Sequence, residues 1–224
     1  MTADRGSRPS PGARAEGFLV LEGDPARARA CARVLGRARP VAVAGALAEA
    51  RARCRAARAP WTGVLVAARL ARPGAAPERG LDLLAELRAS GRLPPALVVA
   101  APADRGALLR AHDLGARCLP GPLEEAQLDL FAARALAVER CPDPGLRAIL
   151  EAFVGRWRLR PREAELLGLA SLGHERGRLP AETGAAPDTV KDRVRALLRR
   201  TGARSFEELV RSVRRAYFGG RPVI

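Results

Sequence analysis

Gly63-Val64-Leu65-Val66-Ala67 is a continuous run of apolar residues, and a proline- and glycine-rich loop at residues 71–77 follows it. A strand that is apolar at every position has both faces buried, which is usual for strands of parallel sheets. The run therefore predicts a strand of a parallel sheet with helices on both faces. Similar apolar runs recur along the first two thirds of the chain, at residues 18–21, 41–44, 96–100 and 118–119.

A segment with helical character follows each of these runs, at residues 26–35, 47–57, 80–89, 105–112 and 124–139. Five strand–helix units in about 120 residues predict a doubly wound α/β domain of flavodoxin-like size, built on a five-stranded parallel sheet. We expect this domain to span residues 17–140. Residues 1–16 are rich in Ser, Pro, Gly and Arg and lack the apolar segment of a signal peptide, which predicts a disordered tail.

The last third of the chain has helical patterns only and predicts a separate all-α domain. Cys141-Pro142-Asp143-Pro144-Gly145 is typical of a turn, so we place a linker at residues 141–146, the domain at 147–218 and a tail at 219–224. Ser205 and Glu208 form a capping-box pattern that marks the start of the last helix. The predicted helices cover residues 146–157, 163–172, 180–183, 188–200 and 205–217.

The chain is strongly basic, and nearly all of its basic residues are arginines. The formal net charge is +15, of which residues 141–224 carry +7, and the pI is about 11.4. Such a charge favours polyanionic partners, above all nucleic acid. The abundance of Ala, Gly, Pro and Arg also fits a composition bias, in which part of the charge has no function. Lys191 is the single lysine.

Several other kinds of site are not expected. The four cysteines are scattered and the two histidines are isolated, which predicts free thiols in a reducing cytoplasm and neither a disulfide framework nor a metal site. No apolar run reaches the roughly 18 residues that would span a membrane. The sequence has no phosphate-binding loop and no nucleophile elbow, so we predict no enzyme, no catalytic residues and no cofactor.

The stretch from Leu159 to Val210 resembles the LuxR-type helix-turn-helix domain, over about 50 residues without gaps. Its Leu159-Arg160-Pro161-Arg162-Glu163 matches the opening of the family motif, and Thr189-Val190-Lys191 matches the recognition helix. The other matching residues are Gly173, Gly184, Val194, Gly202, Glu208 and Leu209. The resemblance implies that the domain binds double-stranded DNA with one helix in the major groove, and that two copies pair through the last helix. The residues expected at that homodimer interface are Phe206, Leu209, Val210 and Val213; the alternative is that they pack only inside the domain.

The helix from Asp188 has an apolar stripe and a cationic stripe. Val190, Val194 and Leu197 recur at helical spacing and should face the core, whereas Lys191, Arg195 and Arg199 should face bases and phosphates. The alternative is a charged face that only contacts solvent. The helix before it contains Pro180, which is tolerated only in a first turn and predicts a short helix. The predicted DNA-binding residues are Thr189, Lys191, Asp192, Arg193, Arg195, Arg199 and Arg200.

The α/β part resembles the receiver domain of two-component response regulators, through Gly80-Leu81-Asp82-Leu83-Leu84, Gly115-Ala116 and Leu119-Pro120 with Pro122. The resemblance implies five positions for a phosphorylation site, which here are Glu22, Gly23, Ala67, Ala100 and Gly121. Alanine in place of the aspartate provides no nucleophile, so an aspartyl phosphate cannot form. We therefore predict an inactive phosphorylation site in a pseudo-receiver whose role is contact with another protein or with itself. Glu22 and Asp24 are expected to be two solvated carboxylates.

Two functions are consistent with these sequence features. The first is a DNA-binding transcription regulator that is controlled without aspartyl phosphorylation. The alternative is a protein-interaction module whose helix-turn-helix has drifted and binds a protein partner in place of DNA.

Overall fold

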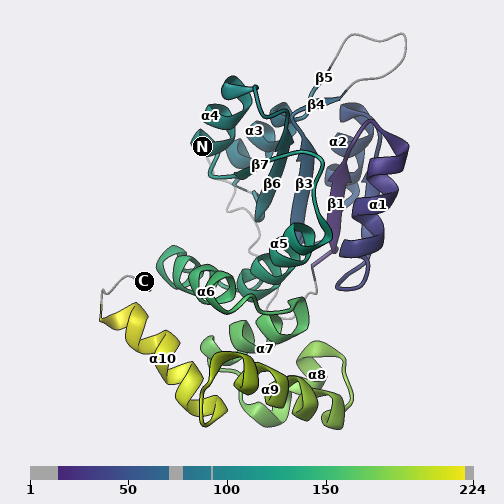
Figure 1. The fold of residues 1–224 in the computed structure, drawn as a ribbon. Coiled ribbons are helices and arrows are strands. Elements are labelled where there is room, and N and C mark those ends of the chain that lie inside the picture. Colours follow the sequence, from purple (N-terminus) through teal and green to yellow (C-terminus); the bar gives the residue numbers. More distant parts are fainter. Residues whose placement is uncertain (1–14, 71–77, 92, 220–224) are drawn as a thin grey trace, which may run out of the picture.

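The structure is a computed structural model, and it describes residues 15–70, 78–91 and 93–219. Residues 1–14 of the tail predicted at 1–16, the loop at 71–77 and residues 220–224 of the tail predicted at 219–224 lie outside the described residues. Within the described part, no helix is both long enough and apolar enough to cross a lipid bilayer. Figure 1 shows an α/β layer and a group of helices beneath it.

The first part of the chain folds into a five-stranded parallel sheet, as predicted. The strands are β1 (Phe18–Leu21), β2 (Val41–Ala44), β3 (Gly63–Ala67), β6 (Ala96–Ala100) and β7 (Arg117–Pro120). They lie in the order β2-β1-β3-β6-β7, and every neighbouring pair is parallel. The predicted flavodoxin-like fold class is therefore confirmed.

Helices cover both faces of the sheet, because successive strand residues point to opposite sides. Phe18 and Val20 pack toward α1 (Pro25–Leu35) and α5 (Glu125–Val138). Leu19 and Leu21 pack on the other face. That second face is covered by α2 (Leu47–Ala56), α3 (Leu81–Ala89) and α4 (Arg105–Asp113).

A short antiparallel hairpin follows the central strand and was not predicted. It pairs β4 (Arg69–Leu70) with β5 (Glu78–Arg79). The chain then returns at Gly80, where a Cβ atom would lie only 2.2 Å from the Ala67 carbonyl oxygen. A glycine at this position lets the hairpin and the start of α3 lie directly against the end of β3.

The last part of the chain is helical, as predicted. Its α-helices are α6 (Pro144–Trp157), α7 (Pro161–Ser171), α8 (Leu179–Thr183), α9 (Pro187–Thr201) and α10 (Phe206–Phe218), with a 3₁₀ turn at Arg176–Arg178. The predicted starts of α6 and α7 each fall two residues late. In both helices a proline occupies the first turn, where its missing N–H costs nothing.

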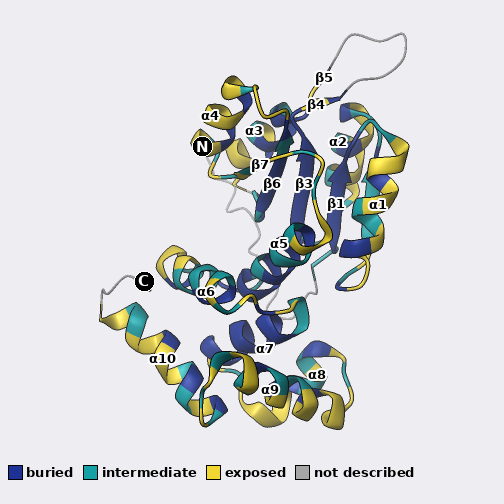
Figure 2. Cartoon of the chain, in the orientation of Figure 1, coloured by how far each residue is buried: buried dark blue, intermediate teal, exposed yellow. Residues whose placement is uncertain are grey.

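Helix α5 belongs to both parts of the molecule. Phe131, Ala132 and Leu136 join the core under the sheet, whereas Ala133 and Ala137 join the core of the C-terminal helices. No residue from 128 to 138 is exposed. A helix that is buried all round lies inside a protein, and Figures 1 and 2 show α5 between the sheet and α7, coloured buried or intermediate over most of its length. The two cores therefore share a helix, and the helical domain is not independent of the α/β layer.

The contact between α5 and α7 is close at one glycine. A Cβ atom on Gly168 would lie 2.2 Å from the carbonyl oxygen of Ala137. The two helix backbones touch here because Gly168 has no side chain.

A buried ion network lies beside this helix contact. Arg39 is 13% exposed and donates hydrogen bonds to Glu139 and Glu165, whose side chains are 8% and 4% exposed. Glu139 also accepts from the hydroxyl of Thr62, and Glu165 accepts from Arg162. Burial opposes the charge of Arg39, but the two carboxylates outweigh it and raise the pKa of the guanidinium. The network thus joins the α/β layer, the end of α5 and α7.

Candidate nucleic-acid interface

Helix α9 has one buried face and one exposed face, as its sequence predicts. Val190, Val194 and Leu197 are 4%, 2% and 0% exposed and belong to the C-terminal core. Lys191, Arg195 and Arg199 are exposed. Figure 2 shows the outer side of α9 as mostly exposed. The predicted placement of Lys191 and Arg195 on an outward face is therefore confirmed.

Two of these cations form ion pairs within the helix. The Lys191 ammonium lies 2.9 Å from the Asp188 carboxylate, and the Arg195 guanidinium lies 3.0 Å from Asp192. All four side chains are more than 60% exposed, so each pair is screened by solvent and contributes little to stability. The hydrogen bond from Lys191 also lowers the pKa of Asp188. Arg199 has no ion-pair partner among the described side chains.

Arg200 has a contact within the protomer that the sequence did not predict. Its Nε lies 3.1 Å from Glu163, which is 5% exposed and also accepts a hydrogen bond from the Arg160 backbone N–H. Glu163 thus caps the N-terminus of α7 and holds the end of α9 against the first turn of α7. This contact gives Arg200 a structural role beside the DNA contact predicted for it.

The turn before α9 has the expected form. Helix α8 has five residues, with Pro180 in its first turn, as the sequence predicted. The Thr183 hydroxyl donates to the Leu179 carbonyl at 2.8 Å, and Gly184 ends the helix in a left-handed conformation. These features fix the angle at which α9 leaves the turn.

A second stripe of α9 faces the α/β layer across a cavity of about 700 Å³. Thr189, Asp192 and Arg193 line this cavity together with Arg37 and Asp129. Burial, with the nearby charge of Arg162, lowers the pKa of Arg193. Three of the seven predicted DNA-binding residues therefore border the α/β layer, whereas Lys191, Arg195 and Arg199 face solvent.

The predicted pairing surface on α10 needs correction. Phe206, Leu209 and Val213 are 4%, 2% and 0% exposed, because they fill the protomer's own core. The sequence pattern of α10 predicts an apolar stripe, but it does not indicate which part of the protein, or which second copy, covers that stripe. Of the four predicted residues only Val210 is partly accessible, and Phe218 at the helix end is 82% exposed.

The positions expected for a phosphorylation site come together at the carboxyl ends of the strands. Glu22, Ala67, Ala100 and Gly121 line one cavity of about 480 Å³; Gly23 does not line it. The side chains that Ala67 and Ala100 contribute to this lining are methyl groups, which carry no nucleophile.

Of the two carboxylates at this edge, Glu22 is buried, contrary to expectation, whereas the Asp24 side chain is 43% exposed, as expected. Glu22 is 5% exposed and accepts hydrogen bonds from the Asp24 backbone N–H at 2.9 Å and from Arg27 at 3.2 Å. Asp24 caps α1 by accepting from the N–H groups of Ala26 and Arg27, and these hydrogen bonds lower its pKa. Both groups therefore stabilise the start of α1.

No protein-family model matches this sequence, and no curated protein matches it either. Solved structures with a similar fold include full-length FixJ from B. japonicum, at 20% identity and a TM-score of 0.49, covering 93% of this chain and 100% of that one. The response regulator StyR has 24% identity and a TM-score of 0.41, covering 88% and 98%. A CheY-like response regulator receiver domain protein from Methanospirillum hungatei JF-1 has 16% identity and a TM-score of 0.43, covering 51% and 88%. Likenesses at this level establish neither a family nor a function for this chain.

Proposed function

We propose that this protein is a sequence-specific transcription regulator that binds double-stranded DNA through α9. The observation that carries the proposal is the outward stripe formed by Lys191, Arg195 and Arg199, on a helix whose other face is anchored in the core. A helix held in this way can enter a major groove while the rest of the domain contacts the backbone. The sequence motif that resembles LuxR-type domains supports the same proposal.

The intrahelical ion pairs do not oppose DNA binding. Each exposed pair is weak, whereas a base edge or a phosphate offers the same cation a charge-assisted hydrogen bond. We expect Lys191 and Arg195 to exchange Asp188 and Asp192 for guanine edges, and Arg199 to contact a phosphate.

Control without phosphorylation is the second part of the proposal. It rests on Ala67 and Ala100, which place methyl groups where phosphoryl chemistry needs oxygen atoms. Pairing of two copies on DNA is the third part, and the accessible residues of α10 available for it are Val210 and Phe218.

The test compares DNA binding by matched variants. Binding of genomic fragments is measured by gel shift at several salt concentrations for the wild type, Lys191→Ala, Arg195→Ala and the control Arg33→Ala, which removes an exposed arginine from α1. Loss of a guanine contact should weaken cognate binding by about 1–3 kcal/mol and leave non-cognate binding unchanged, whereas loss of a phosphate contact should reduce the salt slope by about 1. Footprints of a dimer should show two half-sites roughly 10 bp apart.

The alternative is a protein-interaction module with a helix-turn-helix that no longer binds DNA. The observation that favours it is the pairing of both N-terminal cations of α9 with carboxylates, which gives this part of the stripe mixed charge. If both variants fold and keep the full affinity and selectivity of the wild type, α9 does not contact DNA, and the alternative is the better account.

A further inference from the structure

We propose that a cavity between the β4–β5 hairpin and α4 binds a small phosphorylated organic molecule. The cavity is separate from α9, it adjoins the cavity lined by the phosphorylation positions, and nothing in the proposed DNA-binding function requires it. Its volume is about 440 Å³, within the range of small-ligand sites.

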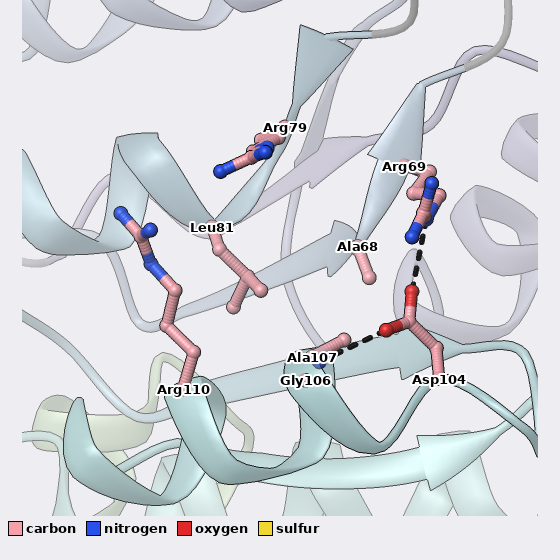
Figure 3. A pocket seen from close by; sticks show the side chains of 8 residues that line it. All are labelled: Ala68, Arg69, Arg79, Leu81, Asp104, Gly106, Ala107 and Arg110. Atoms are coloured by element: carbon pink, nitrogen blue, oxygen red, sulfur yellow. Dashed lines mark hydrogen bonds and ion pairs between the residues drawn. The ribbon is translucent and has the colours of Figure 1, made fainter.

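Three guanidinium groups from three different elements surround this cavity. Figure 3 shows Arg69 on β4, Arg79 on β5 and Arg110 on α4, with their side chains around a common space. One carboxylate, Asp104, lines the cavity with them, so the lining carries a net positive charge. Guanidinium groups on different sides of one cavity match the oxygen atoms of a phosphate group, which accept two parallel hydrogen bonds from an arginine that turns toward them.

Contacts on the hairpin and on α4 hold the Arg69 side chain and the backbone at the base of β5. Asp104 accepts from Arg69 Nε at 2.9 Å and from the Ala107 backbone N–H at 3.0 Å, so it ties β4 to the first turn of α4. The close approach of Gly80 to the Ala67 carbonyl holds the base of β5. The site is therefore largely formed before a ligand enters.

The arginines are available to a ligand. Arg110 pairs with Asp82 at 2.9 Å, but these side chains are 45% and 39% exposed, and such a pair is easily exchanged. Arg79 is exposed and has no ion-pair partner among the side chains that the structure describes. Two of the three guanidinium groups can thus turn toward an anion at little cost.

The floor of the cavity is apolar and indicates an organic ligand. Leu81, Ala68 and Ala107 are 5%, 4% and 7% exposed and lie beneath the arginines. Inorganic phosphate alone would leave this surface in contact with water, whereas an attached carbon group would cover it. The adjoining cavity over the strand ends shares Ala68, Arg69 and Asp104, and provides room for a longer molecule.

Isothermal titration of the full-length protein tests the site, with phenyl phosphate, inorganic phosphate and benzoate as probes in low-salt buffer without DNA. We expect phenyl phosphate to bind with a stoichiometry of one, more tightly than phosphate because of the apolar floor and at least tenfold more tightly than benzoate. Arg79→Ala and Arg110→Ala should each weaken phenyl phosphate at least about tenfold, because each removes a charge-assisted hydrogen bond. The control Arg33→Ala should bind like the wild type.

Several results would overturn the proposal. These are no binding by the wild type, several equivalent sites per chain, equal affinity for benzoate, or an equal loss in Arg33→Ala, which would indicate general arginine charge. Melting curves of each variant show that it is folded; the mutated arginines are exposed and carry little of the core. Because no DNA is present and neither arginine lies on α9, failure here leaves the DNA-binding proposal untouched.

Discussion

Gly168→Ala distinguishes the effect of helix propensity from the effect of helix packing. In an isolated helix this change would stabilise by about 0.5–1 kcal/mol, because glycine loses more backbone entropy on folding than alanine does. In this structure the added Cβ would meet the Ala137 oxygen at 2.2 Å, the carbonyl carbon at 2.9 Å and the Cα at 3.0 Å. All three are backbone atoms of α5, so no side-chain rotation can relieve the contact.

The magnitude follows from this distance. A carbon–oxygen contact normally lies at roughly 3.3–3.6 Å, so α5 and α7 must separate by about 1 Å. A gap of that size forfeits a quarter to a half of the dispersion energy along the rest of the interface. We therefore expect a net loss of about 1–3 kcal/mol, the usual cost of overpacking a core. For a chain of this size, each kcal/mol corresponds to a fall in Tm of about 2–4 °C.

Urea denaturation followed by circular dichroism measures the effect, with Gly106→Ala as the matched control. A Cβ on Gly106 in α4 would meet only the Asp104 carboxylate oxygen, at an ordinary 3.7 Å. The control should be as stable as the wild type or slightly more stable. If Gly168→Ala proves as stable as the wild type, α5 and α7 do not touch at this position and do not share a packed core.

Three further outcomes are expected. Acetyl phosphate with Mg²⁺ should leave the intact mass unchanged, because β3 ends without an aspartate; an acid-labile, base-labile phosphoryl adduct would contradict this. Arg39→Met should cost about 3–5 kcal/mol in urea titrations, because it leaves Glu139 buried without a cation and Glu165 with Arg162 alone, and replacing both glutamates by glutamine as well should restore most of the loss. Asp24 and Asp104 have pKa values below their usual 3.8, Asp24 through backbone N–H groups at its helix start and Asp104 mainly through Arg69. Their ionised forms therefore stabilise the fold fully above pH 3.8 and lose this effect as the pH falls through the lower folded-state pKa. The double variant Asp24→Asn/Asp104→Asn should lose less stability than the wild type between about pH 5 and pH 2.5. A double variant with the same acid denaturation profile as the wild type would contradict the assignment.

The main strands and helices were predictable because their signals are local. A run such as Gly63–Ala67 is apolar throughout and ends at a turn, and caps such as Ser205 mark helix starts directly in the sequence. The β4–β5 hairpin was missed because strands of two residues have no periodicity to detect. The outward placement of Lys191 and Arg195 followed from the apolar residues between them.

Long-range contacts were not predictable from these patterns. The apolar stripe of α10 looks the same whether its own core or a second copy covers it, and here Leu209 and Val213 are used inside the protomer. Arg39 is hidden among many exposed arginines, and nothing in its neighbours indicates burial. The sequence does contain one signal that was overlooked: residues 128–138 are apolar on nearly every side, which is unusual for a helix covering only one face of a sheet.

The burial of α5 on all sides limits how the two halves of this chain can diverge in evolution. A helix that covers a single core keeps a solvent-facing side, on which substitutions accumulate at little cost. From residue 128 to 138 every position of this helix is at least partly covered, so most changes must suit the sheet, α7 or both. Exchanging the C-terminal helices with those of another protein at residue 141 would separate Ala133 and Ala137 from the residues they pack against. A chimera that keeps both cores intact must carry α5 and α7 from the same parent.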